Sequence, residues 1–132
     1  MSYFYLHTAA MSVGFLLLVV GAGIARFQRQ RRWWLNAHKT AGRIGAAAML
    51  AGLVAAILMV ERSGSGHLHV PHAGIGLVEI FFALMTLVLG QLQFKIRDKA
   101  RQLREKHRWS GRITLIVGLV TILSGLLAAG II

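Results

Sequence analysis

The chain has 132 residues, of which 56% are hydrophobic and only 14% are charged, and its formal net charge is +11. Soluble domains are about 45–50% apolar, so this composition predicts an integral membrane protein, too short for more than one compact domain, residues 1–132. The absence of cysteine excludes thiolate-bound iron–sulfur clusters, covalent c-type haem attachment and disulfides. The positive charge could suggest nucleic acid, but the bases lie in two short loops that flank apolar segments, so we expect no nucleic-acid partner.

Four apolar segments are long enough to cross a bilayer, which takes about 20 residues of helix. The first of them is not preceded by the positively charged region of a cleavable signal peptide, so we expect it to be retained. The predicted fold class is an all-α membrane protein, a bundle of four transmembrane helices made of two repeated helix hairpins. The predicted spans are roughly residues 5–25, 41–60, 72–92 and 113–132.

The basic residues predict the orientation of these spans. Fourteen of the fifteen Lys and Arg residues lie in the connections between spans one and two and between spans three and four or, for Arg43, just inside the adjoining end of span two, and Arg62 is the exception. The positive-inside rule places both basic connections in the cytoplasm and both termini outside. We expect a bacterial inner membrane with periplasmic termini. Orientation and contact with anionic membrane lipid explain most of these bases.

An internal repeat relates the two halves of the chain. The sequence HKTAGR at 38–43 returns 69 positions later as HRWSGR at 107–112, each with the form His, base, two residues, Gly, Arg. Spans one and three align more weakly, each opened by a histidine, His7 and His72. The pattern predicts two copies of one hairpin in the same orientation, related by an axis along the membrane normal. Chance similarity between Leu/Ala/Gly-rich helices stays an alternative, mainly for spans one and three.

Four histidines fall at matching depths in this arrangement. His7 and His72 lie near the outer ends of spans one and three, and His38 and His107 lie near the cytoplasmic ends of spans two and four. Topology and the repeat axis both pair His7 with His72 and His38 with His107. Two neutral imidazoles that face each other bind haem iron axially, which favours electron transfer over oxygen binding. A single histidine at a membrane helix end is more often an interfacial polar residue, but four in matched pairs favour ligands.

Small and basic residues near these histidines fit the same hypothesis. Gly42 and Gly111 each lie four residues beyond a histidine, on the same helix face, and would make room for a porphyrin. Gly14, Gly45 and Gly76 lie on histidine faces too, although small residues also simply let membrane helices pack closely. Bases beside the cytoplasmic pair would neutralise the propionates of a haem: Arg26, Lys39, Arg43, Arg108 and Arg112.

Five motifs resemble the four-helix core of the cytochrome b561 family, including the membrane half of DOMON-linked members. They are HTAAM at 7–11, GAGIARF at 21–27, Trp34 with His38, HAGIG at 72–76 and, most specifically, HRWSGR at 107–112. The resemblance implies two haem b groups, ligated by helices one with three and two with four. It implies an electron-transfer cytochrome or oxidoreductase subunit rather than a stand-alone enzyme.

We expect neither the two extra helices nor the DOMON domain of many members here, which leaves the donor and acceptor open. Quinol, ascorbate or a redox partner protein are the expected partners, in a homodimer or a larger electron-transfer complex.

Other features keep competing interpretations open. His67, His69 and His72 form H-x-H-x-x-H, a potential metal site, and His69 is the substitute ligand if the third span starts earlier. Glu79, seven residues beyond His72, is an intramembrane carboxyl that would either carry protons or serve packing. The alternative functions are a histidine-lined metal transporter or metal-binding membrane protein, and a structural subunit without a cofactor.

Overall fold

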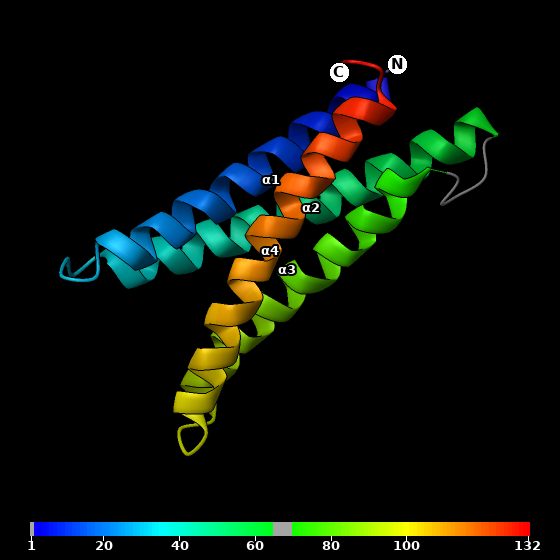
Figure 1. Cartoon of the computed structure of the whole chain (residues 1–132). Coiled ribbons are helices and arrows are strands. Elements are labelled where there is room, and N and C mark those ends of the chain that lie inside the picture. Colours follow the sequence, from blue (N-terminus) through cyan, green and yellow to red (C-terminus); the bar gives the residue numbers. More distant parts are fainter. Residues whose placement is uncertain (1, 65–69) are drawn as a thin grey trace. The chain divides into compact units, whose positions relative to one another are not determined.

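A computed structural model describes residues 2–64 and 70–132 and contains four long helices in those ranges (Figure 1). They are α1 (Ser2–Phe27), α2 (Trp34–Ser63), α3 (Pro71–Lys95) and α4 (Ala100–Ala128). Each is long and apolar enough to cross a membrane. The described residues form no strand. The predicted all-α class with four membrane-spanning helices is therefore confirmed.

The helices extend beyond the predicted apolar spans at their basic ends. The fourth helix begins at Ala100 rather than near residue 113, because the preceding stretch is rich in Arg, Lys, Leu and Glu, which are good helix formers. The two repeated motifs at 38–43 and 107–112 consequently lie inside α2 and α4. At the other end α4 stops at Ala128, and Gly130 then takes a left-handed backbone conformation with φ 67°.

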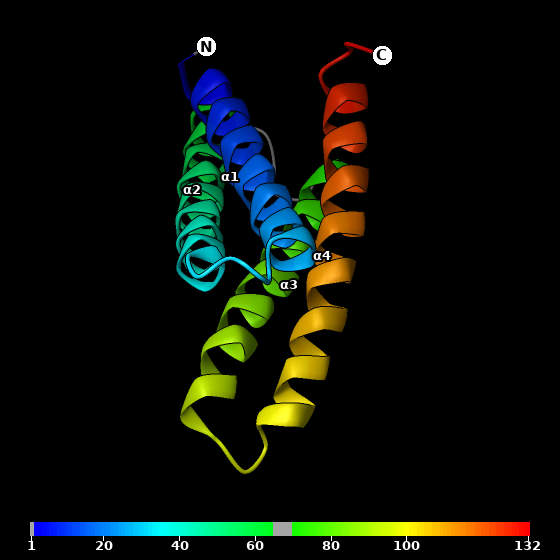
Figure 2. The ribbon, with the colours of Figure 1, turned by 90° about the vertical axis from the view of Figure 1, so that its left-hand side faces the viewer.

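The helices pack as two antiparallel hairpins, α1 with α2 and α3 with α4 (Figure 2). Residues 28–33 connect the first pair and residues 96–99 the second. We call this connected end of each hairpin its basic end, and the opposite end its open end. Each hairpin is a compact unit, as the repeat predicts. A single domain over residues 1–132 stays a prediction.

Two glycines bring α1 and α2 into close contact in the first hairpin. A Cβ atom added to Gly14 would lie 2.6 Å from Met49 Cγ and 2.9 Å from the carbonyl oxygen of Gly45. One added to Gly45 would lie 3.0 Å from the carbonyl oxygen of Gly14. Membrane helices gain van der Waals contact where small residues let the backbones approach. Gly14 and Gly45 thus serve helix packing, the simpler of the two interpretations offered for them.

Hydroxyl groups join α3 and α4 in the second hairpin. The Thr86 hydroxyl lies 2.6 Å from Ser110 Oγ and 3.1 Å from Thr114 Oγ1. Ser110 and Thr114 are each 3% exposed. Hydrogen bonds between helices contribute to association in a membrane because lipid offers polar groups no alternative partner.

Thr86→Val is expected to destabilise this hairpin by about 1–3 kcal/mol, because it removes a shared partner from two buried hydroxyls. Denaturant-induced unfolding in detergent, followed by circular dichroism, measures the change. Thr8→Val is the control, since the exposed Thr8 hydroxyl bonds only to Phe4 within its own helix. Equal effects of the two substitutions would contradict a specific role for the hydroxyl cluster.

Candidate functional site

In the first hairpin, each predicted histidine ligand is bonded to the backbone of the neighbouring helix. His7 Nδ1 on α1 lies 2.9 Å from the carbonyl oxygen of Gly52 on α2, near the open end. His38 Nδ1 on α2 lies 2.8 Å from the carbonyl oxygen of Gly21 on α1, near the basic end. Both contacts are partly buried. The hairpin therefore holds one oriented imidazole near each end.

The second hairpin repeats this arrangement. His72 Nδ1 on α3 lies 3.1 Å from the carbonyl oxygen of Thr121 on α4, and also 3.1 Å from Ser124 Oγ. His107 Nδ1 on α4 lies 2.9 Å from the carbonyl oxygen of Thr86 on α3. The equivalent of Ser124 in the first hairpin is Ala55, which has no hydroxyl group.

The carbonyl partners decide where each ring carries its proton. A carbonyl oxygen only accepts, so each Nδ1 donates and the lone pair of the neutral ring lies on Nε2. Metal-binding histidines characteristically donate their other ring N–H to a backbone carbonyl or carboxylate, which fixes the tautomer and the ring orientation. The four rings thus fit the role of axial haem ligands through Nε2.

The carbonyl partners also occupy equivalent positions of the repeat. A shift of 65 positions relates His7 to His72 and Gly21 to Thr86. A shift of 69 positions relates His38 to His107 and Gly52 to Thr121. Helices one and three, whose sequences align weakly, therefore match in the same way as helices two and four. This agreement confirms the two repeated hairpins.

Two glycines that sequence reasoning missed make room for imidazole rings in the second hairpin. A Cβ atom added to Gly90 would lie 3.0 Å from His107 Cε1, and one added to Gly125 would lie 2.9 Å from His72 Cε1. Each glycine is on the helix opposite its histidine and far from it in sequence. No local pattern joins such pairs, so only the helix pairing reveals them.

The family of the chain follows from its sequence as a whole. A family model described as Eukaryotic cytochrome b561 matches residues 6–132, which include all four histidines. The chain belongs to the cytochrome b561 family. Membership implies transmembrane electron transfer through b-type haem. No curated protein and no solved structure matches the chain.

The two glycines predicted to clear space for a b561 haem have different surroundings. A Cβ atom at Gly42 would have no atom within 4 Å, whereas one at Gly111 would lie 3.6 Å from Thr86 Cγ2, an ordinary contact. A side chain added at Gly42 would therefore extend into open space, whereas Gly111 faces α3. Their role beside a haem stays a prediction.

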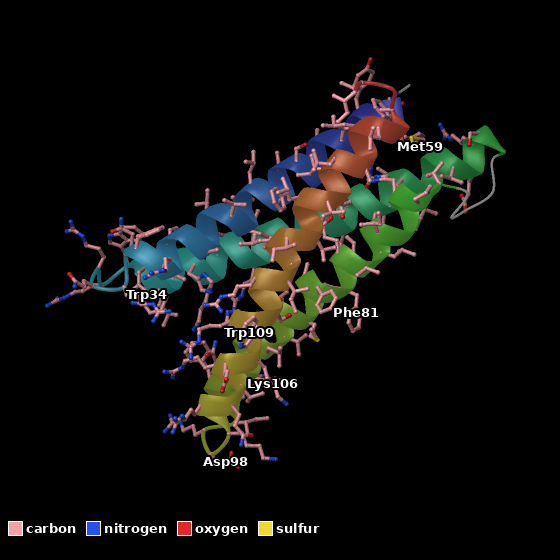
Figure 3. All side chains as sticks on the ribbon, viewed as in Figure 1. Trp34, Met59, Phe81, Asp98, Lys106 and Trp109 are labelled. Atoms are coloured by element: carbon pink, nitrogen blue, oxygen red, sulfur yellow. The ribbon has the colours of Figure 1, made fainter. Side chains whose placement is uncertain are left out.

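The bases predicted to neutralise the propionates of a b561 haem lie near the basic ends of the hairpins. The Arg112 guanidinium lies 5.0 Å from the centre of the Trp109 ring, and that of Arg26 lies 5.7 Å from the Phe27 ring. Figure 3 shows Trp109 at the same end of α4 as the connection that carries Asp98. The other three are the half-buried Lys39 and the exposed Arg43 and Arg108. Their contact with propionates stays a prediction.

At the open end, the b561 ligand predicted in span three lies within a helix. Pro71 begins α3, a position where its missing N–H costs nothing, and His72 follows in the first turn. His67 and His69 lie outside the described residues, so the H-x-H-x-x-H metal site and the substitute ligand are untested. The described residues contain no group of three potential metal ligands.

Proposed function

We propose that this chain transfers electrons across the membrane through two b-type haems, one near each face. His7 and His72 would hold one haem and His38 and His107 the other. The observation that carries the proposal is the set of four imidazoles, each oriented by a carbonyl at an equivalent position of the repeat. Each pair takes one ligand from each hairpin.

The residues of the chain supply orientation and charge. When bound, a haem iron with two imidazole ligands accepts and donates one electron without offering an open coordination position. The carbonyl bonds hold Nε2 of each ring in one direction and prevent the ring from turning. At the basic ends, the Arg and Lys side chains provide positive charge for propionates, whereas Arg62, near the open end of α2, is stacked over Tyr3 at 4.6 Å.

The partners follow from the predicted orientation. The basic ends would face the cytoplasm and the termini the periplasm of a bacterial inner membrane, because Lys and Arg are retained on the cytoplasmic side. Quinol, ascorbate or a partner cytochrome would donate electrons at one face, and an acceptor would take them at the other. The chain would act as a subunit of an electron-transfer complex or as a homodimer.

Haem content tests this proposal directly. The purified protein should show the α-band of a b-type cytochrome in its reduced-minus-oxidised spectrum. Haem extracted as its pyridine complex, measured against protein concentration, should give two haems per chain. A single haem per chain would contradict the paired arrangement, and the absence of an α-band would refute the proposal as a whole. Metal analysis of the same sample tests the alternative of a histidine-lined metal site.

A further inference from the structure

The two hairpins differ systematically along the contact between their helices. Six positions in the second hairpin are polar, and the equivalent position in the first is glycine or alanine in every case. The first hairpin shows that helix packing and the histidine–carbonyl bonds need no polar side chains there. The polar positions with their counterparts are Glu79 (Gly14), Thr86 (Gly21), Ser110 (Ala41), Thr114 (Gly45), Thr121 (Gly52) and Ser124 (Ala55).

Glu79 is the one carboxyl within the predicted membrane spans of this chain. It is 2% exposed, and its side chain is hydrogen-bonded to the Thr121 side chain. Burying a carboxyl in an apolar environment is costly, particularly in its charged form. Since glycine serves the same packing position in the first hairpin, packing alone does not account for the glutamate.

The Thr121 hydroxyl can serve either protonation state of Glu79. The hydroxyl lies 2.9 Å from the carbonyl oxygen of Val117, and when it donates its single hydrogen there it can accept a hydrogen bond from a protonated Glu79. If Glu79 loses its proton, rotation of the Thr121 hydroxyl would turn this hydrogen to the carboxylate. The site therefore offers a hydrogen bond to both the neutral and the charged form.

Thr121 also connects this carboxyl to a haem ligand. Its backbone carbonyl accepts from His72 Nδ1 at 3.1 Å and from the Ser124 hydroxyl at 2.9 Å. Glu79 lies seven residues beyond His72 on the same helix, about 10 Å along its axis. Charges at such separations interact strongly in a medium of low dielectric constant. An electron added near His72 would thus favour proton binding at Glu79.

We propose that Glu79 is a proton-binding site whose occupancy follows the oxidation state of the haem held by His72. Glu79 takes up one proton from the aqueous phase for each electron that this haem accepts from its donor, and releases it when the electron leaves. The bond formed and broken is the O–H bond of the carboxyl group. The proposal rests on the proposed function and adds proton transfer to it.

Few other ionisable groups face Glu79 in its hairpin. Helix α4, which packs against α3, has no ionisable side chain from Ile113 to its end. On α3 itself, His72 is the only other one before Lys95. A proton-linked change that depends on residue 79 is therefore readily assigned.

The test is the pH dependence of the two haem midpoint potentials, measured by spectroelectrochemistry in wild type and Glu79→Gln. In wild type, the potential of the His72 haem should fall with rising pH, approaching ~59 mV per pH unit for one proton per electron. Glu79→Gln should abolish this slope and leave the other haem unchanged. An unaltered slope in the variant would overturn the proposal, because another group, such as a haem propionate, would then bind the proton.

Two further samples complete the test. Thr114→Val is the control, because Thr114 is a buried threonine on α4, like Thr121, but its hydroxyl lies beside the Ser110 carbonyl and the Thr86 hydroxyl rather than beside Glu79; it should retain the slope. Infrared difference spectra of wild type should show a carboxyl band that changes on reduction and shifts in Glu79→Asp, which decides the matter if the Gln variant fails to fold. Absence of such a band overturns the proposal. Absence of haem from wild type instead refutes the proposed function.

Discussion

Replacement of His38 or of His107 by alanine is expected to remove the same haem. The two histidines occupy equivalent positions of the repeat, and each donates Nδ1 to a carbonyl near the basic end of its hairpin. A b-type haem has no covalent attachment, so loss of one axial ligand should release it or leave it high-spin. Haem quantification with low-temperature spectra and redox titration of each variant identifies which haem is lost. We expect about half of the wild-type haem to remain.

The reciprocal variants provide the control for this pairing. His7→Ala and His72→Ala should both remove the other haem and leave the one held by His38 and His107. His69→Ala should retain both, unless His69 rather than His72 is the ligand. Loss of different haems from His38→Ala and His107→Ala would refute the pairing, while leaving each residue a potential ligand.

Gly14→Ala is expected to destabilise the first hairpin by about 1–3 kcal/mol, the usual cost of overpacking a filled interface. The added methyl group would meet backbone atoms, the Gly45 carbonyl oxygen at 2.9 Å and Met49 N at 3.1 Å. Backbone cannot turn aside as a side chain does, so the helices must separate. Both the His7 and the His38 carbonyl bonds span this interface and should weaken with it. Unfolding in detergent measures the loss, and haem content should fall in parallel.

Gly23→Ala is the matched control for this substitution. Gly23 is on the same helix, and an added Cβ would have no atom within 4 Å. Alanine is favoured over glycine in helices by roughly 1 kcal/mol, so the control should be neutral or slightly more stable. Equal destabilisation by both substitutions would contradict a specific role of Gly14 in the contact between α1 and α2, because helix propensity favours alanine at both positions.

The sequence predicted the four spans, the hairpin repeat and the histidines because these depend on patterns local in the chain. Hydropathy marks a span, and the repeated His-base-x-x-Gly-Arg motif marks equivalent helices. Hydropathy predicted the membrane spans but not the full length of the helices. The length of an apolar segment reflects the thickness of the hydrocarbon layer. Helix α4 also includes a polar stretch of thirteen residues, from Ala100 to Arg112. Their helix propensity favours this extension, but a hydropathy pattern does not detect it.

The hydrogen-bond partners of the histidines were beyond sequence reasoning. A backbone carbonyl is present at every residue, so nothing in the sequence distinguishes Gly52 or Thr86 as an acceptor. The same holds for Gly90 and Gly125, whose importance depends on a ring that reaches them from another helix. The role of Gly14 was ambiguous for a related reason, since a glycine on a histidine face also lies close to the helix contact.

In each hairpin, each helix has a histidine that donates to a backbone carbonyl of the other helix. This reciprocal arrangement has a consequence for how such a protein can arise. Each hairpin carries one oriented histidine near its basic end and one near its open end, so under the proposed pairing it would hold half of each haem site and no complete site. Two identical copies of a single hairpin, associated as a parallel dimer, would already supply all four ligands. Duplication and fusion of such a unit would produce a chain with the internal repeat seen here. Fusion then frees the two halves to diverge, and the glutamate and hydroxyls found in only one of them are the kind of change that a symmetric dimer could not acquire separately.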